Sequence, residues 1–232
     1  NNDNDTLQYN IYGCDTLLNG QYTIGVSGAD YVSFQDALQA MIRCGINGPV
    51  TFRVNDGVYN ENLYINTALI LGSNSQNTIS FVSTSGNAAN VILGNHQALG
   101  ASALVLDGAS NLIFKDITIG LNSENTGVAV EFLGMCENIE FNSCIIQTYD
   151  QATSNTYCGV KYYNSSSSSN YLKNVKFVHN HIDGGYYNFW FYYSAGTSSN
   201  MGNMSVIIDS NTLSNAYYAG FYTYYNGNYP SV

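Results

Sequence analysis

The sequence predicts an all-β chain that winds as a single-stranded parallel β-helix, a solenoid, with a capping helix at its N-terminal end. Three observations predict this fold: a nine-residue apolar pattern that recurs, a second family of strands between its copies, and one helical segment before the first copy. We therefore expect one domain, with the N-terminal segment and capping helix at residues 1–48 and the coils at residues 49–232. The chain stops soon after its last expected strand, so we expect the natural polypeptide to continue beyond Val232.

The helical segment runs from Ser33 to Cys44. Ser33 and Asp36 resemble a capping box, and Gly45 is a ready C-cap. Its apolar side chains share one helical face: Phe34, Ala37, Leu38, Met41 and Ile42. An amphipathic helix at this point covers the open end of a solenoid, which otherwise exposes strand edges and core.

The recurring pattern has four clear copies, which begin 27 to 36 residues apart at Asn111, Asn138, Asn174 and Ser205. Fainter copies begin at Pro49 and Thr78. Three places in each copy are apolar: the second (Leu112, Ile139, Val175, Val206), the fourth (Phe114, Phe141, Phe177, Ile208) and the ninth (Ile119, Ile146, Ile182, Leu213). Alternation with period two predicts strands, and so long a repeat without helices predicts coils that bury their apolar residues by stacking. A β-sandwich is the rival interpretation, but sandwiches lack a fixed long period.

A second family of strands lies between these copies: Ala103–Leu106, Val128–Phe132, Gly159–Tyr162, Phe189–Phe191 and Gly220–Tyr224. The copies themselves begin with Asn three times. At a bend between strands, each Asn amide can bond the amide one coil away, as in the ladders of cross-β stacks. We therefore expect an Asn ladder along the solenoid.

The composition excludes several classes of protein. Lys and Arg number 6 against 16 Asp and Glu, for a net charge of −10, so the chain lacks the basic footprint of a nucleic-acid binder. The 14% of aromatic residues argues against disorder. Neither a membrane span of about 20 apolar residues nor a signal peptide is visible. Many Asn, Ser, Tyr and Gly give an uncharged polar surface, which suits a secreted or cell-surface protein that meets sugars.

Cysteine and histidine give little sign of chemistry. The five Cys form no CxxC and no zinc spacing, their odd number excludes complete internal pairing, and small buried hydrophobic roles are favoured for most of them. His179 and His181 alternate in one expected strand and could form a metal pair, but two partly exposed solenoid residues are favoured. We therefore expect no cofactor and no metal.

Two N-terminal stretches, Gly28–Ala40 and Val50–Ile65, resemble the start of the pectin methylesterase and pectate-lyase-like superfamily. The resemblance rests on a helix start and on a strand pair with Gly57, Tyr59 and Glu61. Together with Cys14–Gly25, the region also resembles repeat-rich surface proteins of Bacteroidetes. The resemblance implies that the β-helix is right-handed.

The catalytic pattern of that superfamily is not matched. In pectin methylesterases one Asp is the nucleophile, a second is the acid/base, and an Arg orients the nucleophile. The resemblance puts Asn188 at the nucleophile and Gln151 at the acid/base, with Asp150 one step earlier. No Arg follows Arg53, and an amide is not a carboxylate nucleophile. A lyase of the superfamily implies a basic residue with acidic calcium ligands, and no acidic cluster appears after residue 60. We therefore assign no catalytic residue.

Strand alternation predicts a binding face instead. If Val160, Phe189, Phe191 and Phe221 point inward, a two-wide ladder points outward: Lys161, Tyr163, Trp190, Tyr192, Tyr222 and Tyr224. The intervals agree, because both members of each pair lie 29 and then 32 residues apart on consecutive coils. Glu131 falls one coil before Lys161, within reach of a salt bridge. We expect flat aromatic faces to stack on sugar rings, while Asn188, Asp150 and Lys161 bond the sugar hydroxyls.

The most favoured function is non-catalytic: an extracellular or cell-surface β-helix protein that binds carbohydrate or acts as an adhesin. Its expected partners are a polysaccharide or glycan and other surface proteins, without nucleic acid or membrane insertion. A divergent carbohydrate-active enzyme, similar to a polysaccharide lyase or an esterase, is the first alternative. A structural stalk or fibre segment, in which the aromatic ladders only stiffen the solenoid, is the second.

Overall fold

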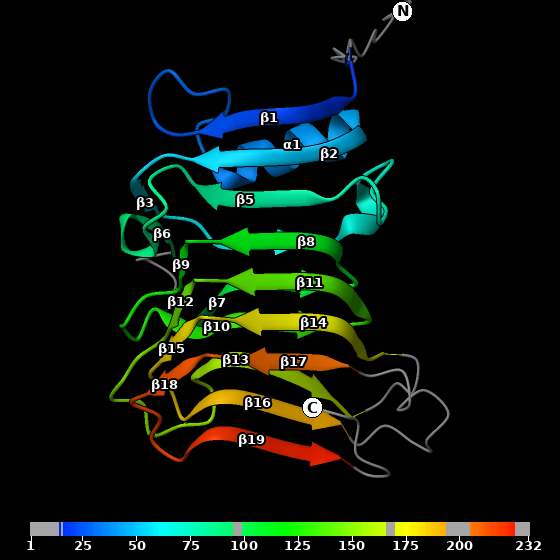
Figure 1. The fold of residues 1–232 in the computed structure, drawn as a ribbon. Coiled ribbons are helices and arrows are strands. Elements are labelled where there is room, and N and C mark those ends of the chain that lie inside the picture. The colour runs from blue at the N-terminus through cyan, green and yellow to red at the C-terminus, as the bar shows by residue number, and fades with distance from the viewer. Residues whose placement is uncertain (1–13, 15, 95–98, 166–169, 194–204, 226–232) are drawn as a thin grey trace, which may run out of the picture.

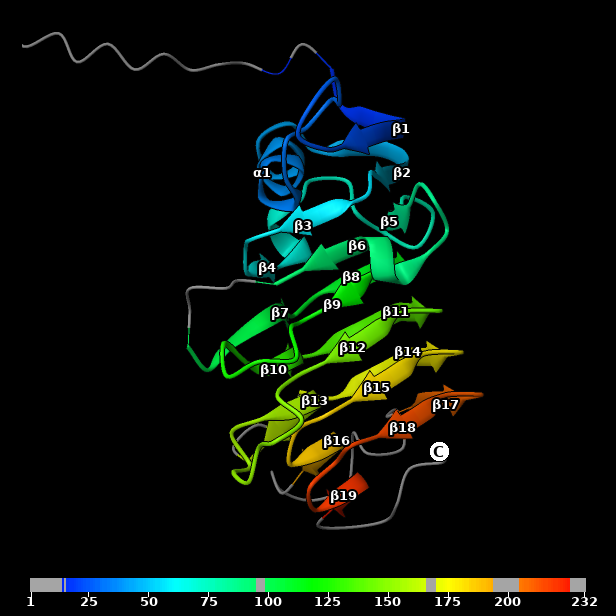
Figure 2. The same cartoon turned by 90° about the vertical axis from the view of Figure 1, so that its left-hand side faces the viewer.

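The chain forms a right-handed parallel β-helix, in which each coil passes through three sheets before the next coil begins (Figures 1 and 2). The structure is a computed structural model, and it describes residues 14, 16–94, 99–165, 170–193 and 205–225. Every strand pairing between neighbouring coils of the described residues is parallel, and each inner coil is hydrogen-bonded to the coil before it and the coil after it. The predicted all-β solenoid fold is confirmed.

Sheet A has seven strands: β1 (Leu18–Ile24), β2 (Ile46–Val54), β5 (Ile79–Ser83), β8 (Ser110–Lys115), β11 (Cys136–Asn142), β14 (Leu172–Val178) and β17 (Val206–Asp209). Sheet B has six short strands: β3 (Gly57–Tyr59), β6 (Val91–Leu93), β9 (Thr118–Ile119), β12 (Ile145–Gln147), β15 (His181–Asp183) and β18 (Thr212–Ser214). Sheet C also has six: β4 (Leu63–Ile65), β7 (Ala101–Asp107), β10 (Thr126–Leu133), β13 (Cys158–Asn164), β16 (Tyr187–Tyr193) and β19 (Ala219–Tyr225). Two 3-10 turns, η1 (Thr67–Leu69) and η2 (Ala88–Asn90), lie in the early coils.

The core lies between the three sheets, and the repeat predicts its register. Places two, four and nine of the pattern pair from coil to coil, as in Leu112 with Ile139 and Ile119 with Ile146. The fourth place forms a column of stacked rings with centroids 5.0 to 5.5 Å apart: Phe52, Phe81, Phe114, Phe141 and Phe177. All five rings are fully buried, so each coil covers the apolar surface of the next.

The predicted Asn ladder is present at the start of sheet A. Asn174 Nδ2 donates to Asn138 Oδ1 at 2.8 Å, and Asn138 Nδ2 donates to Asn111 Oδ1 at 3.3 Å. All three residues have left-handed backbones, with φ between 52° and 61°. Asn tolerates this conformation better than most residues, so the same side chain makes the bend and bonds the neighbouring coil.

The capping helix α1 (Phe34–Cys44) packs at the N-terminal end of the solenoid (Figure 2). Ser33 caps it by accepting a hydrogen bond from the Asp36 N–H, and Gly45 ends it with φ 74°. A disulfide joins Cys44 at the end of the helix to Cys14. No helix in the described part of the chain is long and apolar enough to cross a membrane.

One feature of this end differs from the sequence-based expectation. Strand β1 precedes the helix and pairs with β2, so sheet A begins within the segment assigned to the cap. Only Leu18 and Ile24, the two ends of β1, are buried, so no alternating pattern marks the strand. The cysteines agree with the expectation for most of them, because Cys136, Cys144 and Cys158 are free and buried. The pairing, which the sequence left open, joins Cys14 to Cys44.

Candidate functional site

The predicted register of the outer side of sheet C is confirmed. Lys161 pairs with Trp190 and Trp190 with Tyr222, while Tyr163 pairs with Tyr192 and Tyr192 with Tyr224. The inward residues Val160, Phe189 and Phe191 are buried. Phe221 is 39% exposed, because no described coil follows β19 to cover it. We term the outward set the aromatic face: Tyr163, Trp190, Tyr192, Tyr222 and Tyr224.

The aromatic face differs from a flat platform in the orientation of its rings. Tyr192 stacks on Tyr163 at 4.5 Å and on Tyr224 at 4.8 Å, each with 11° between the ring planes. Both faces of the Tyr192 ring are therefore covered by its neighbours. Stacked rings on consecutive coils present their edges outward. Among the three stacked Tyr residues, Tyr163 is 45% exposed and Tyr224 is 44% exposed, and both are more open than Tyr192. We expected flat ring faces open to a sugar, and for Tyr192 this expectation is wrong. The accessible part of the Tyr192 ring is its edge.

Trp190 occupies the centre of the face. Its ring lies edge-on to Tyr163 at 5.5 Å and is tilted against Tyr187 at 5.4 Å. Lys161 Nζ lies 5.7 Å from the Trp190 ring centroid, within cation–π range. The indole Nε1 is buried and has no hydrogen-bond partner among the described residues, although such N–H groups usually find one.

Tyr187 belongs to this surface, and the sequence analysis missed it. Tyr187 lies two residues before Phe189, so strand alternation predicts that it points inward. Its ring instead contacts Trp190, and also Tyr222 at 5.0 Å, outside the main core. The alternation breaks because the next residue, Asn188, takes the inward position. Tyr187 packs with Val128 and Cys158, the residues at the same position on the two preceding coils.

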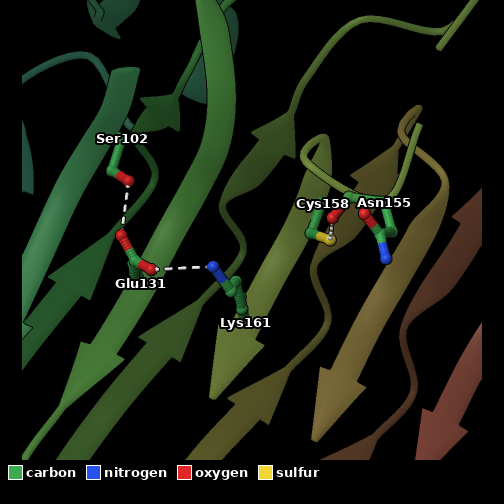
Figure 3. A network of polar contacts seen from close by, with 5 residues as sticks. All are labelled: Ser102, Glu131, Asn155, Cys158 and Lys161. Carbon is green, nitrogen blue, oxygen red and sulfur yellow. Dashed lines mark hydrogen bonds and ion pairs between the residues drawn. The ribbon is translucent and has the colours of Figure 1, made fainter. Parts of the chain in front are cut away.

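A line of polar contacts extends the aromatic face toward the earlier coils (Figure 3). Lys161 Nζ lies 3.1 Å from Glu131 Oε1, which confirms the predicted salt bridge, and Ser102 Oγ donates to Glu131 Oε2 at 2.6 Å. The ammonium and carboxylate therefore compensate each other. Beside them, Cys158 donates to the Asn155 carbonyl at 3.4 Å, and burial raises the pKa of its thiol to about 12. This thiol remains protonated at neutral pH and is a poor nucleophile.

Two residues assigned to the binding site lie elsewhere. Asn188 is 1% exposed, and its Nδ2 donates to the carbonyls of Gly184 at 3.0 Å and Ser214 at 2.9 Å. The side chain satisfies backbone groups of its own and the next coil, so it cannot reach a ligand on the outer side. Asp150 lies in the turn after β12, off the strands of sheet C, and its N–H donates to Asn122 Oδ1. Of the three polar residues expected to bond a sugar (Asn188, Asp150 and Lys161), only Lys161 lies beside the aromatic rings.

The two histidines are separated by a bend. His179 has φ 58° and precedes β15, whereas His181 opens that strand, so they do not alternate within one strand. His181 Nε2 lies 2.7 Å from Ser214 Oγ, which donates to Asp183 at 2.6 Å. Because the Ser stands between the His and the Asp, the geometry is that of a cross-coil polar ladder rather than a hydrolytic triad. The described residues contain no group of three or more His, Cys, Asp or Glu placed to hold a metal ion.

No protein-family model and no curated protein matches the chain. Solved structures similar to it include pectin methylesterase PemA from Erwinia chrysanthemi, at 12% identity and a TM-score of 0.42, covering 83% of this chain and 65% of that enzyme. The chain thus spans just under two thirds of that enzyme's length. Pectin methylesterase from Aspergillus niger is also similar, in its deglycosylated form (13% identity, TM-score 0.37, 83% of this chain and 85% of that one). A penultimately deglycosylated form gives 11% identity, a TM-score of 0.34, and 88% and 90% coverage.

At 11–13% sequence identity, a likeness to these structures says nothing about activity. The strands, their parallel pairing and the turn of the coils establish the fold directly. The chain is a parallel β-helix.

Proposed function

We propose that this chain is an exported, non-catalytic β-helix protein that binds a carbohydrate along the aromatic face. The observation that carries the proposal is a continuous outer surface of five partly exposed aromatic rings, three in one row and two in the other, beside a compensated Lys161–Glu131 pair. Exposed aromatic surface of this extent commonly marks an interaction site. A sugar chain lying along the solenoid axis contacts ring edges and phenol groups at the repeat of the coils, about 4.8 Å.

Export is supported by the disulfide between Cys14 and Cys44. Disulfides form and persist mainly in oxidising compartments, such as the cell exterior and the periplasm. The bond ties the N-terminal segment to the end of α1, where it restrains the capping helix.

The chemistry of the described face favours binding over catalysis. The position that the family resemblance gives to a nucleophile holds Asn188, an amide turned into the coil. The thiol of Cys158 is buried, with its pKa raised to about 12, and Lys161 is held by Glu131. The amide and the protonated thiol are not activated nucleophiles, and the Lys161 ammonium is engaged in an ion pair.

The test is a glycan array followed by calorimetry with the best ligand. Trp190→Ala should weaken binding by roughly 1–3 kcal/mol, on the scale known for bases stacked on aromatic side chains. Tyr217→Ala is a matched control, because Tyr217 is 62% exposed but lies before β19, outside the aromatic face. Equal loss in both variants, or no loss in Trp190→Ala, would remove the face as a binding site. De-esterification or cleavage of pectin by the pure protein would contradict the non-catalytic proposal.

A structural stalk is the second candidate, and one observation favours it. The Tyr163, Tyr192 and Tyr224 rings use their faces to contact one another, as a ladder that stiffens a solenoid would do. In that case no glycan should bind, and the role of Tyr192 should appear only in stability, as a lower free energy of unfolding in Tyr192→Ala.

A further inference from the structure

A groove lies on the outer side of the turns that lead from sheet C into sheet A. It consists of two adjoining hollows of about 260 and 510 Å³, which share Ser75, Asn111 and Asn138 as lining residues. We term it the ladder groove, because the Asn ladder runs along it. It is separate from the aromatic face, since its described lining includes no residue of that face and no aromatic ring.

One wall of the groove is the connection between η1 and β5, residues 70–78. Asn74 holds this loop together, because its Oδ1 accepts from the N–H groups of Gln76 and Asn77 at 2.8 and 3.0 Å. The Ser110 N–H donates to Thr67 Oγ1 at 2.9 Å and joins the start of η1 to the next coil. The wall is therefore set before any ligand arrives, and a preorganised site loses less conformational entropy on binding.

Polar groups in this groove have unused hydrogen-bonding capacity. Ser73 lines the larger hollow, and its buried Oγ has no hydrogen-bond partner among the described residues. Asn111 is the last amide of the ladder, whose three side chains are aligned in a chain of hydrogen bonds. Hydrogen bonds in such a chain polarise one another, which strengthens the interaction offered by the terminal amide. A buried hydroxyl without a partner is costly, so a ligand hydroxyl that bonds it gains more than usual.

The charges around the groove compensate one another. Lys173 forms an ion pair with Glu137 at 3.4 Å, and Lys176 lies opposite Glu140 in the register of β11 and β14. Two ammonium groups and two carboxylates leave no net charge to attract an ion. The remaining lining residues are amides, hydroxyls and small or aliphatic side chains. This set fits a neutral ligand that both donates and accepts hydrogen bonds.

We propose that the ladder groove binds a short segment of a neutral sugar chain, lying along the Asn ladder. The amides of Asn111 and Asn138 bond the sugar hydroxyls, Ser73 supplies a further hydroxyl, and Ile113 contacts the apolar edge of a ring. Binding here works mainly by hydrogen bonding with one aliphatic contact, whereas the aromatic face adds contacts to aromatic rings. The inference does not depend on the aromatic face, because it concerns different residues.

The experiment is nuclear magnetic resonance titration of the intact chain with cellotetraose, xylotetraose and mannotetraose, with tetragalacturonate as the acidic counterpart. We expect at least one neutral tetrasaccharide to shift the side-chain amide signals of Asn111, Asn138 and Asn174. Ser73→Ala and Asn111→Gly should each lower the affinity about three- to tenfold. Glycine keeps the left-handed backbone of Asn111, whose φ is 61°, so this variant removes only the amide.

Ser80→Ala is the matched control, because Ser80 lies on β5 outside both hollows and loses the same hydroxyl. It should bind as the unchanged chain does. Ser73→Ala should keep or raise the free energy of unfolding, since the buried hydroxyl that it removes has no partner and costs desolvation. Weaker binding in this variant then reports the ligand contact and not a folding defect.

Three results would overturn the inference. The neutral tetrasaccharides could leave the three Asn amides unshifted, tetragalacturonate could bind the groove at least as tightly as they do, or Ser80→Ala could lose as much affinity as Ser73→Ala. Shifts confined to the Trp190 indole would support the aromatic face and reject the ladder groove. Shifts at the Asn amides alone would do the reverse, so the two proposals can fail separately.

Discussion

The molecule contains two aromatic ladders with nearly the same geometry and opposite surroundings. Inside sheet A, the rings of the Phe column stack at 5.0 to 5.5 Å and are fully buried. Outside sheet C, Tyr163, Tyr192 and Tyr224 stack at 4.5 and 4.8 Å and are partly open to solvent. The coil repeat sets the spacing in both cases. The difference shows that in-register stacking follows from the fold. Whether the rings serve stability or binding depends on whether they lie inside or outside the solenoid.

Among single substitutions, the largest expected effect is on the buried ladder. Phe141→Ala should lower the free energy of unfolding by about 3–5 kcal/mol, because Phe141 stacks on Phe114 and Phe177 and its removal leaves a cavity. Denaturant unfolding followed by tryptophan fluorescence measures it. Phe141→Leu, which fills much of the space, is the control and should lose less. A loss below about 1 kcal/mol in Phe141→Ala would mean that the column is not the core of the coil stack.

Raised pH should destabilise the folded chain through its buried thiols. Burial raises the pKa values of Cys136, Cys144 and Cys158 to about 12. The unfolded chain releases these protons near pH 8.5, so the stability that they contribute is complete below that pH and is lost as pH rises toward 12. Each thiol contributes a slope of up to about 1.4 kcal/mol per pH unit in this window. Unfolding measured from pH 8 to 11 tests this, and replacing Cys144 with Ala should reduce the slope.

Two of these thiols lie on opposite sides of the coil wall, so their reactivities can be compared. Cys144 lies in the main core, whereas Cys158 packs outside it and bonds the carbonyl of Asn155 in the β12–β13 connection. We expect a thiol reagent to modify Cys158 faster than Cys144, because opening a surface connection costs less than opening a coil. Mass spectrometry of the labelled chain would show it. Equal rates would mean that both thiols become accessible only on global unfolding.

The exposed ladder should matter less to folding. Tyr192→Ala should lower the free energy of unfolding by about 1 kcal/mol, the scale of aromatic pair interactions beyond area burial. Tyr192→Phe keeps the stacking and should leave stability unchanged. If Tyr192→Phe nevertheless weakens a bound glycan, the phenol group contacts that ligand. A stability loss in Tyr192→Ala as large as that of Phe141→Ala would erase the distinction between the two ladders.

The smallest effect belongs to the ion pair that borders the aromatic face. Glu131→Gln should lower the free energy of unfolding by roughly 0.2–1 kcal/mol, and the difference should shrink at high salt. Glu137→Gln, in the more exposed pair with Lys173, should change stability less still. Unfolding in low and high sodium chloride measures both variants. A loss at Glu131 that salt does not change would show that the bond from Ser102, rather than the charge, stabilises this site.

Sequence predicts those parts of the molecule that obey its two periodicities. Alternation within strands and the repeat between coils together give the register of Phe114 with Phe141 and of Trp190 with Tyr222, because a solenoid repeats one geometry. The Asn ladder follows from the same repeat. Features that depart from it were missed. Tyr187 faces outward because alternation breaks at Asn188, and β1 has too few buried residues to show a pattern.

The candidate sites show the same division. The position of each ring on sheet C is predictable, but the orientation of that ring is not, because it depends on how neighbouring rings pack in the space between coils. The ladder groove depends on the path of residues 70–78 beside the turns of the later coils. Loop paths carry no periodicity, so the sequence gives no signal for the groove even though it predicts the ladder along its floor.

The matched columns also make the chain modular in length. Removing residues 138–173, which make up one coil, would place Asn174, Val175 and Phe177 next in register to Asn111, Leu112 and Phe114. Each junction residue would then meet a partner of the kind it already has, an amide on an amide and a ring on a ring. We expect such a shortened protein to fold, about 4.8 Å shorter along its axis. A molecule built in this way can change its reach by whole coils and keep both its cap and its final coils intact.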